Sequence, residues 1–323
     1  MKRFIFTGIF ALTSCALFAS NHPPSGEFGV TGEWLYFMPS FDDTYFVTKS
    51  SETSNYPQGR RHNNDPHYHS GFRVAGVYSF CECDREFYLD YTHLGVSQRK
   101  TVNGDFLWAS LGRPDFTSSF ENYTGDAKSH LKFNYNRADA LLEQLIFCGC
   151  DYNLRLLFGL EYANFYLRES YRYDSQTTFG TIRQKNYTWG IGPEVGFSFD
   201  YRICQFLDCF PGAFSINVVS SGSILSGKTN NRENNVLQGN QILNVKDRGS
   251  WRLIPAFHAR VGLNYTVCIC DNEAAFEVGY EFDTYSRGLA RVTYPDDVAD
   301  GLAETNYYNF DLQGLYVSAT YCF

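Results

Sequence analysis

The chain has 323 residues, and its 35 Asp and Glu against 27 Lys and Arg give a formal net charge of -8 at pH 7. This acidic balance argues against nucleic acid as a partner, because proteins that bind nucleic acid carry basic surfaces. Phe, Trp and Tyr make up 18% of the residues, yet the mean hydropathy is only -0.32. A barrel in a bilayer has such a composition, because its strands alternate lipid-facing with interior-facing residues and aromatic residues gather at both membrane interfaces.

The first 19 residues have the layout of a secretory signal peptide. Lys2 and Arg3 precede an apolar run over 4–18, and Ala19 completes a cleavage site, so we expect residues 1–19 to be removed on export. The run is shorter than the ~20 residues of a membrane-spanning helix. As an alternative, segment 12–15 resembles a lipobox, which would make Cys15 a lipid-modified N-terminus. The apolar residues beyond Cys15 favour cleavage after Ala19, which leaves residues 20–323 as a single barrel domain.

Ten later segments alternate apolar and polar residues with a period of two. In 189–203 the alternation lasts 15 residues, whereas an ordinary globular strand has about five or six. Such a length suits a tilted strand that crosses a bilayer and projects beyond it. The pattern predicts an all-β fold, an antiparallel transmembrane β-barrel of about ten strands, within a range of ten to fourteen. The segments cover residues 28–38, 70–80, 85–98, 132–146, 153–168, 187–203, 212–226, 251–267, 273–287 and 310–323; 132–146 is the least regular, and a short helix is its alternative.

The connections between these segments alternate between long and short. Barrels of the bacterial outer membrane have long loops outside and short turns in the periplasm, so the rhythm predicts both chain ends on the periplasmic side. In the first long loop, His62, His67 and His69 lie near two arginines; we expect a solvated loop there, with a surface metal or anion site as the alternative. The long connections lie near 39–69, 99–131, 169–186, 227–250 and 288–309, and the short ones near 81–84, 147–152, 204–211 and 268–272.

The final segment is an alternating strand that stops on an aromatic residue. Leu315, Val317, Ala319, Tyr321 and Phe323 share one face. The end of a soluble domain usually trails off in polar residues, whereas the last strand of a barrel must pair with the first. We therefore predict that Tyr321 and Phe323 form a C-terminal assembly signal and that the protein is located in the cell outer membrane. The partners implied are the lipid bilayer and the barrel-assembly machinery.

Nine cysteines follow the signal segment, and all lie at predicted short turns or at the end of the last strand, which predicts that all nine are periplasmic. The oxidising periplasm favours disulfides, and closure between residues i and i+2 is strained, so we expect bridges between turns or between molecules. The odd number leaves at least one thiol over, which suggests a disulfide-linked homo-oligomer or a bond to another envelope protein. Zinc is disfavoured by the close spacing, and unlinked turn residues are the remaining alternative. The nine are Cys81, Cys83, Cys148, Cys150, Cys204, Cys209, Cys268, Cys270 and Cys322.

Several short motifs resemble the Legionella-type and Chlamydia-related major outer-membrane proteins. The segment from Trp189 to Gly196 is similar to the Gly-x-Gly-Pro-x-x-Gly strand of that family. The segment 32–36, the Cys-containing turns and the final 321–323 add to the likeness, which extends over essentially the whole mature chain. The family consists of pore-forming barrels, and its cysteine-rich members are thought to stiffen the envelope by cross-linking. The resemblance therefore implies a porin-like protein with cross-linking turns.

Charged residues of the strands fall on the polar face, toward the barrel interior. Facing lipid at mid-depth would cost about 2–4 kcal/mol for each Arg or Lys. Because both signs occur, we expect passive diffusion of small solutes with weak selectivity rather than a strong filter. Ten strands nevertheless lie near the eight-stranded size that side chains fill, so a structural or surface-exposed barrel with a closed lumen is the alternative. The predicted lumen-facing residues are Arg73, Asp90, Arg155, Glu161, Glu194, Asp200, Arg202, Arg252, Arg260, Glu277, Glu281 and Asp283.

A barrel enzyme is the third alternative, and we do not expect it. The sequence has no Gly-x-Ser-x-Gly motif. An acid–base pair would have to come from His93 and the acidic pair at 42–43, which carry no further signature. The glycines in 190–196 resemble a dinucleotide fingerprint, but no helix pattern follows them. We therefore predict no catalytic residues, no cofactor and no metal site.

Overall fold

A single antiparallel sheet closes on itself to form a barrel, as predicted. The computed structural model describes residues 28–42, 44–53, 56–80, 85–149, 151–203, 212–247, 249–269, 272–294 and 303–323; the predicted signal peptide and Cys15 lie outside these residues. Around the ring the order is β1, β13, β12, β11, β9, β8, β7, β6, β5 and β4. The ten ring strands are β1 (Phe28–Phe41), β4 (His69–Ser79), β5 (Arg85–Ala109), β6 (Tyr123–Cys148), β7 (Tyr152–Ser175), β8 (Phe179–Arg202), β9 (Gly212–Leu237), β11 (Trp251–Ile269), β12 (Asn272–Thr293) and β13 (Glu304–Cys322).

The last strand closes the ring by pairing with the first. The register of β1 against β13 runs from Gly29 opposite Cys322 to Phe41 opposite Phe310. At the very end, the amide of Phe28 donates to the carbonyl of Phe323 at 3.0 Å, and the reverse bond measures 2.8 Å. The two aromatic rings also meet edge to face, with centroids 5.7 Å apart. Closure satisfies backbone groups that an open edge would leave unpaired in lipid.

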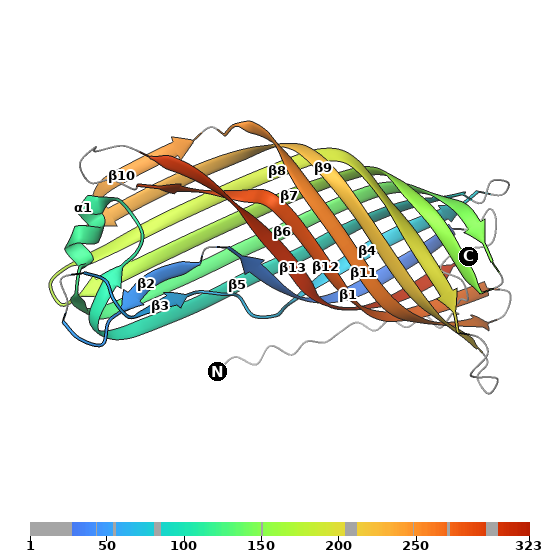
Figure 1. Cartoon of the computed structure of the whole chain (residues 1–323), viewed down its shortest axis with the longest axis horizontal. Helices are drawn as coiled ribbons and strands as arrows, with labels where there is room; N and C mark the ends of the chain where they lie inside the picture. The colour runs from blue at the N-terminus through green and yellow to red at the C-terminus, as the bar shows by residue number, and fades with distance from the viewer. Residues whose placement is uncertain are drawn as a thin grey trace.

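Several shorter elements lie at one end of the barrel. The hairpin of β2 (Tyr45–Lys49) and β3 (Arg60–Asn63) pairs with β5, and β10 (Asn240–Asp247) pairs with β9. Helix α1 (Pro114–Thr117) and the 3-10 turn η1 (Ser118–Phe120) follow β5. Figure 1 shows the elongated barrel from the side, with α1 at one end and the C-terminus at the other. Among the described residues, no helix has the length and apolar character required to cross a bilayer.

Five of the strands are much longer than the predicted segments. Strands β5 to β9 have 24 to 26 residues each, whereas about 9–11 residues suffice to cross a bilayer. The expectation of long loops over 99–131, 169–186 and 227–250 was therefore wrong for much of their length. The turn between β7 and β8, for example, comprises only residues 176–178. Segment 132–146 belongs to β6 throughout, so the helical alternative was also wrong.

The alternation of polar and apolar residues changes face along these long strands. The lower part of the barrel is here the end with the short turns, where β7 begins at Tyr152, and the upper part is the end that carries α1 (Figure 1). In the lower part of β7, Leu160 is exposed on the outer wall while Glu161 is buried inside. In its upper part, Tyr171 and Tyr173 are buried inside while Arg172 is exposed outside. The lower part thus has the lipid-facing pattern of a membrane barrel. In the upper part, charged residues lie on the outer wall and aromatic ones face the interior beside buried Glu169, so the outer wall has the polarity of a surface in water.

Candidate functional site

The barrel interior is the place where charged side chains gather. Nine of the twelve charged residues predicted to face the lumen are buried. Arg260 keeps only 17% of its side chain exposed. Arg252 is half-buried, lies over the Tyr307 ring and donates to the carbonyl oxygen of Arg287, and Arg202 is exposed near the end of β8. Eight of the nine buried residues take part in ion-pair groups, described in turn below, and Asp90 lies beside these groups.

The first group, the Arg73 group, joins four strands on one side of the lumen. Arg73 donates to Glu33 at 2.9 Å and forms a two-pronged pair with Glu281. Arg260 donates to the other oxygen of Glu33 at 3.1 Å and lies 3.4 Å from Glu277. Such bidentate, charge-assisted contacts are among the strong hydrogen bonds in proteins. The group therefore ties β1, β4, β11 and β12 together through their interior faces.

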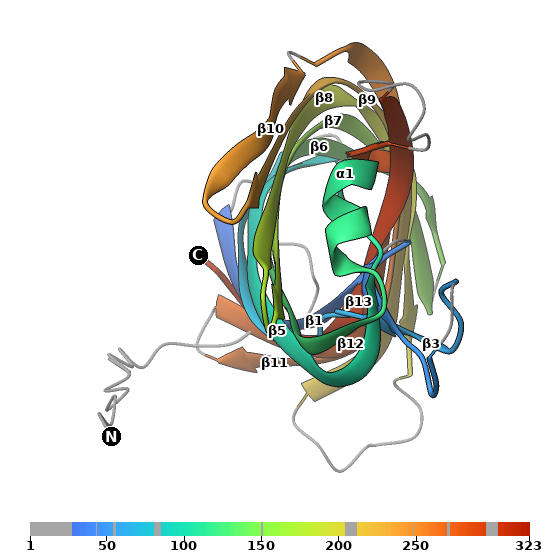
Figure 2. The same ribbon diagram turned by 90° about the vertical axis from the view of Figure 1, so that its left-hand side faces the viewer.

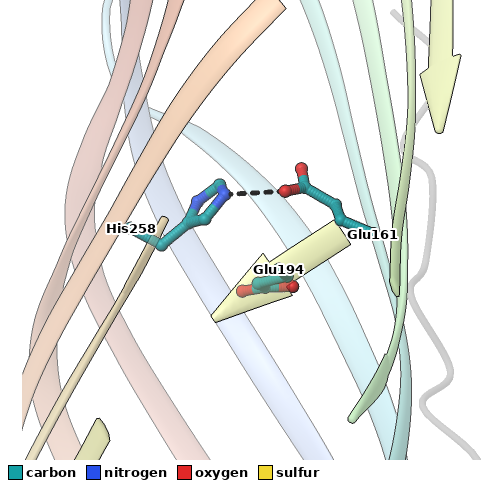
Figure 3. A group of neighbouring side chains, drawn as sticks. All are labelled: Glu161, Glu194 and His258. Carbon is teal, nitrogen blue, oxygen red and sulfur yellow. Dashed lines mark hydrogen bonds and ion pairs between the residues drawn. The ribbon is translucent and has the colours of Figure 1, made fainter. Parts of the chain in front are cut away.

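The second group, the Arg137 group, brings together six buried side chains from five strands. Guanidinium nitrogens of Arg137 lie 2.6 to 3.8 Å from oxygens of all four carboxylates in the group. The imidazole of His258 lies 2.7 Å from Asp283 through Nδ1 and 3.1 Å from Glu161 through Nε2 (Figure 3). Buried charges are costly unless they are paired, and here each charge has opposite partners. The members are Arg137 and Asp139 on β6, Glu161 on β7, Glu194 on β8, His258 on β11 and Asp283 on β12.

Two further predicted residues meet in a smaller cluster. Arg155 lies 3.4 Å from Glu86 and 3.9 Å from Asp200. Asp200 accepts a hydrogen bond of 2.8 Å from Asn217. Buried Asp90 lies near the Arg73 and Arg137 groups, on the wall of the cavity that both share.

A layer of aromatic rings, here called the aromatic layer, lies in the lumen next to the Arg137 group. The ring of Phe165 on β7 lies 4.6 Å from that of Phe310 on β13, and 4.7 Å from that of Tyr285 on β12. Because β7 and β13 are five places apart in a ring of ten strands, these side chains meet across the full width of the barrel. The layer consists of Phe41, Phe133, Tyr135, Phe165, Tyr285 and Phe310; Phe41 is 8% exposed and the others are 0% exposed.

Hydrogen bonds connect the aromatic layer to the Arg137 group. The Tyr285 hydroxyl donates to Glu161 at 2.7 Å and lies 2.9 Å from the hydroxyl of Tyr135. The rings are therefore fixed at their polar ends as well as by packing. A rearrangement of the layer would also disturb the ion pairs below it.

On the side of the aromatic layer that faces α1, further charged and apolar side chains occupy the interior. Arg291 donates to both oxygens of Glu169, at 2.8 and 2.9 Å, and Glu233 lies beside them. Burial raises the pKa of the Glu233 carboxyl to about 7. Higher still, Phe116 of α1 and Phe120 of η1 are fully buried in an apolar cluster with residues of β2, β7 and β8. Figure 2 shows α1 lying across this mouth of the barrel.

On the other side of the Arg137 group, the interior holds a cavity of about 150 Å³. His258 and Glu194 line one end, and Arg73 and Glu277 line its wall. It is also lined by Thr31 of β1 and Thr320 of β13, which pair with each other where the first and last strands close the ring. The cavity is therefore a mixed-charge space that ends at the Arg137 group.

The structure describes only part of the predicted cysteine set. The side chain of Cys148 is exposed at the end of β6, and that of Cys322 is buried at the end of β13. The periplasmic location and the disulfide bonds of the set therefore stay predictions. Cys81, Cys83, Cys150, Cys204, Cys209 and Cys270 lie outside the described residues, as does the side chain of Cys268.

Several interior residues were missed by the sequence analysis. Arg137 and Asp139 lie on β6, where the pattern was irregular because the same face carries Phe133 and Tyr135 of the aromatic layer. Glu33 and Glu86 lie at alternate positions of their strands that face the barrel interior, but the sequence analysis did not single them out. The same is true of His258. Parity alone, applied to every strand, would have found these residues. It would not have shown that they meet, since their contacts join strands far apart in the sequence.

Comparison with known proteins gives the family. Residues 22–323 match the family model described as Legionella pneumophila major outer membrane protein precursor. The chain belongs to this family. The match confirms the family resemblance and the location in the outer membrane. No curated protein sequence matches the chain.

The solved structures that match the chain are distant from it in sequence. The outer membrane protease OmpT of Escherichia coli is 10% identical, with a TM-score of 0.46, over 94% of this chain and 99% of that one. A FadL homologue of Pseudomonas aeruginosa is 10% identical, with a TM-score of 0.28, over 92% and 90%. The anion-selective porin of Comamonas acidovorans is 9% identical, with a TM-score of 0.12, over 92% and 99%. The barrel assignment rests on the strand pairing described above, and the absence of enzyme activity stays a prediction.

Proposed function

We propose that this protein is a structural component of the outer membrane, a β-barrel whose lumen does not let small solutes diffuse passively. The observation that carries the proposal is the aromatic layer, whose rings meet across the barrel from β7 to β13. Barrels of eight strands are filled by side chains, whereas those of 16 strands leave an aqueous channel. Ten strands lie closer to the first size. The proposal takes up the closed-lumen alternative of the sequence analysis in place of the porin-like one.

The energetics support a stable closed interior. Each aromatic pair contributes about 0.5–1.5 kcal/mol beyond the free energy of burying its area. The ring of Phe165 takes part in two such pairs, with Tyr285 and with Phe310. Opening a path would also break the bond from Tyr285 to Glu161. The description of the family as a major outer membrane protein supports an abundant wall component.

Disulfide cross-linking between neighbouring envelope proteins is the second part of the proposal. Support comes from Cys148, which is exposed at the end of β6 where the chain makes a short turn. Structural disulfides persist in oxidising compartments such as the periplasm. An exposed thiol at this rim is accessible to another molecule lying in the same membrane.

A gated channel is the second candidate function, and the mixed-charge cavity favours it. Water already has room beside Arg73, Glu277 and Glu281 on one side of the aromatic layer. If the layer moved, both signs of charge would face the path, and selectivity would be weak because strong filters use rings of one sign. Replacing Glu277 and Glu281 with Gln would then shift the reversal potential toward anions.

A deletion strain tests the structural proposal. Cells that lack the protein should become more sensitive to detergent, and their uptake of small sugars should not fall. Restoring the wild-type gene should restore resistance, and a Phe310→Ala gene should restore resistance while raising uptake. A deletion that lowers sugar uptake and leaves detergent resistance unchanged would favour the channel instead.

A further inference from the structure

Three buried side chains in the lumen have the layout of a metal site. Glu161, Glu194 and His258 each offer one ligand atom, and these atoms lie within 4.8 Å of one another. They come from β7, β8 and β11 and point toward one another in the barrel interior (Figure 3). All three are at most 5% exposed. One imidazole nitrogen and two carboxylate oxygens form a ligand set that zinc and neighbouring first-row metals use.

Unsatisfied oxygen atoms around these residues supply a second, independent observation. One oxygen of Glu194 is buried with no hydrogen-bond partner, and so is one oxygen each of Asp283 and Asp139. Buried carboxylate oxygens normally have donors. The Arg137 group also places four carboxylates against one guanidinium and one imidazole. Negative charge and free lone pairs thus remain available to a cation.

We propose that this lumen site binds a divalent first-row transition metal, of which zinc is the reference. The ligands are Nε2 of His258 and one carboxylate oxygen each from Glu161 and Glu194, with water from the cavity in the fourth position. Nε2 of His258 lies 3.1 Å from Oε2 of Glu161. Two ligand atoms that each lie about 2.0–2.2 Å from one tetrahedral zinc are about as far from each other as Nε2 and Oε2 are here. Small side-chain adjustments therefore suffice to bind the metal.

Neighbouring side chains hold the ligands in the required orientation. Nδ1 of His258 lies 2.7 Å from Asp283 and 3.0 Å from a guanidinium nitrogen of Arg137. With the ring proton assigned to Nδ1, that proton points at Asp283 and Nε2 faces the metal. The Ser221 hydroxyl donates to Oε1 of Glu194 at 2.6 Å. Tyr285 donates to Oε1 of Glu161 at 2.7 Å. Support of this kind is typical of metal ligands, which are fixed by a shell of hydrogen bonds.

The site also contains a positive charge. Guanidinium nitrogens of Arg137 lie 3.0 Å from Nδ1 of His258 and 3.3 Å from Oε1 of Glu194. Four carboxylates surround this one guanidinium, so negative charge remains available to the metal.

The cavity gives the metal a way in. Glu194 and His258 line its inner end, and Thr31 and Thr320 line its outer part near the terminal strand pair. In outer-membrane barrels the end with the short turns faces the periplasm. The site is therefore reached from the periplasmic side, and the aromatic layer separates it from the other end.

Zinc binding to the purified, folded protein in detergent tests the proposal. Thiols are first alkylated, so that cysteines cannot contribute, and folding is checked by heat-dependent gel migration. We expect one zinc per chain after equilibration and gel filtration, a rise in unfolding temperature, and a visible cobalt spectrum without thiolate bands. Mg²⁺ should not compete at equal concentration, because it prefers oxygen ligands and retains its waters.

Three variants decide the outcome. Glu194→Gln and His258→Gln should each lower zinc affinity at least tenfold and abolish the thermal shift. Glu277→Gln, a buried carboxylate in the wall of the same cavity, is the matched control and should bind like the wild type. Should His258→Gln fail to fold, Glu194→Gln alone carries the test. Equal zinc binding by wild type and Glu194→Gln, or no zinc bound to the folded wild type, would overturn the proposal.

Discussion

Arg137 pairs with more carboxylates than any other arginine among the described residues of the interior. Its guanidinium contacts four carboxylates and is buried with them. We expect Arg137→Met to lower the free energy of unfolding by about 3–5 kcal/mol, because it leaves buried carboxylates without their counter-charge. Denaturant titration followed by tryptophan fluorescence measures the change. Arg99→Met, at an exposed position of β5, is the control and should change stability by less than about 1 kcal/mol.

Glu233 should make the stability of the upper barrel depend on pH. It lies above the membrane, since the outer wall at its level carries Lys185 and exposed Arg232. Burial raises its carboxyl pKa to about 7; Glu169 adds to the rise, while Arg291 opposes it. The folded state therefore binds more protons than the unfolded state between pH 4.5 and 7. Stability contributed by the neutral carboxyl is present below that window and is lost as pH rises through it.

The expected size of this effect is up to about 3 kcal/mol between pH 4.5 and 8. Unfolding midpoints measured across that range should fall with pH for the wild type. Glu233→Gln should flatten this part of the curve, and Glu121→Gln, which alters an exposed carboxyl, should not. A wild-type midpoint that climbs steadily from pH 5 to pH 8 would contradict the assignment.

At the scale of the strands, closure of the ring depends on Phe323. Its backbone exchanges two hydrogen bonds with Phe28, and its ring packs on that of Phe28. Unpaired backbone groups each cost several kcal/mol in lipid. We expect deletion of Phe323 to reduce the amount of folded protein in the membrane several-fold, measured by heat-dependent gel migration of membrane fractions.

Val245→Ala in β10, a strand outside the ring, serves as the comparison for the deletion and should leave membrane levels unchanged. Normal levels after deletion of Phe323 would mean that the terminal pair has no role in assembly.

Topology can be read from the reactivity of the Cys148 thiol, which is exposed beside the short turn after β6. After mild reduction, a thiol reagent that cannot cross the outer membrane should leave it unlabelled in intact cells. Permeabilised cells should show labelling. Strong labelling before permeabilisation would place the short turns outside and reverse the orientation of the barrel.

The strands also show why the sequence predicted the lower barrel better than the upper one. In the lower part, apolar residues such as Leu160 face lipid and charged ones such as Glu161 face inward, which gives a clear period of two. In the upper part of β7 the faces exchange roles, with Tyr171 inside and Arg172 outside. A search for lipid-facing strands therefore stopped at residue 168, while the strand continues to Ser175.

At the scale of the whole molecule, the contents of the lumen could not be predicted from parity. Parity places Phe165 and Phe310 inside the barrel, but the sequence does not say that β7 and β13 lie opposite each other. The same holds for Glu161, Glu194 and His258, which are distant in sequence and adjacent in space. The number of strands decides whether such residues meet, because a barrel of ten strands is narrow enough for side chains of opposite walls to touch.

The aromatic layer should close the barrel to ions, and planar-bilayer recording tests this closure directly. Wild-type protein inserted into the bilayer should pass no steady current. A Phe165→Ala, Phe310→Ala double variant should conduct, and Phe197→Ala, which removes a lipid-facing ring, should remain silent. A steady wild-type conductance, unchanged in the double variant, would show that the aromatic layer does not close the lumen.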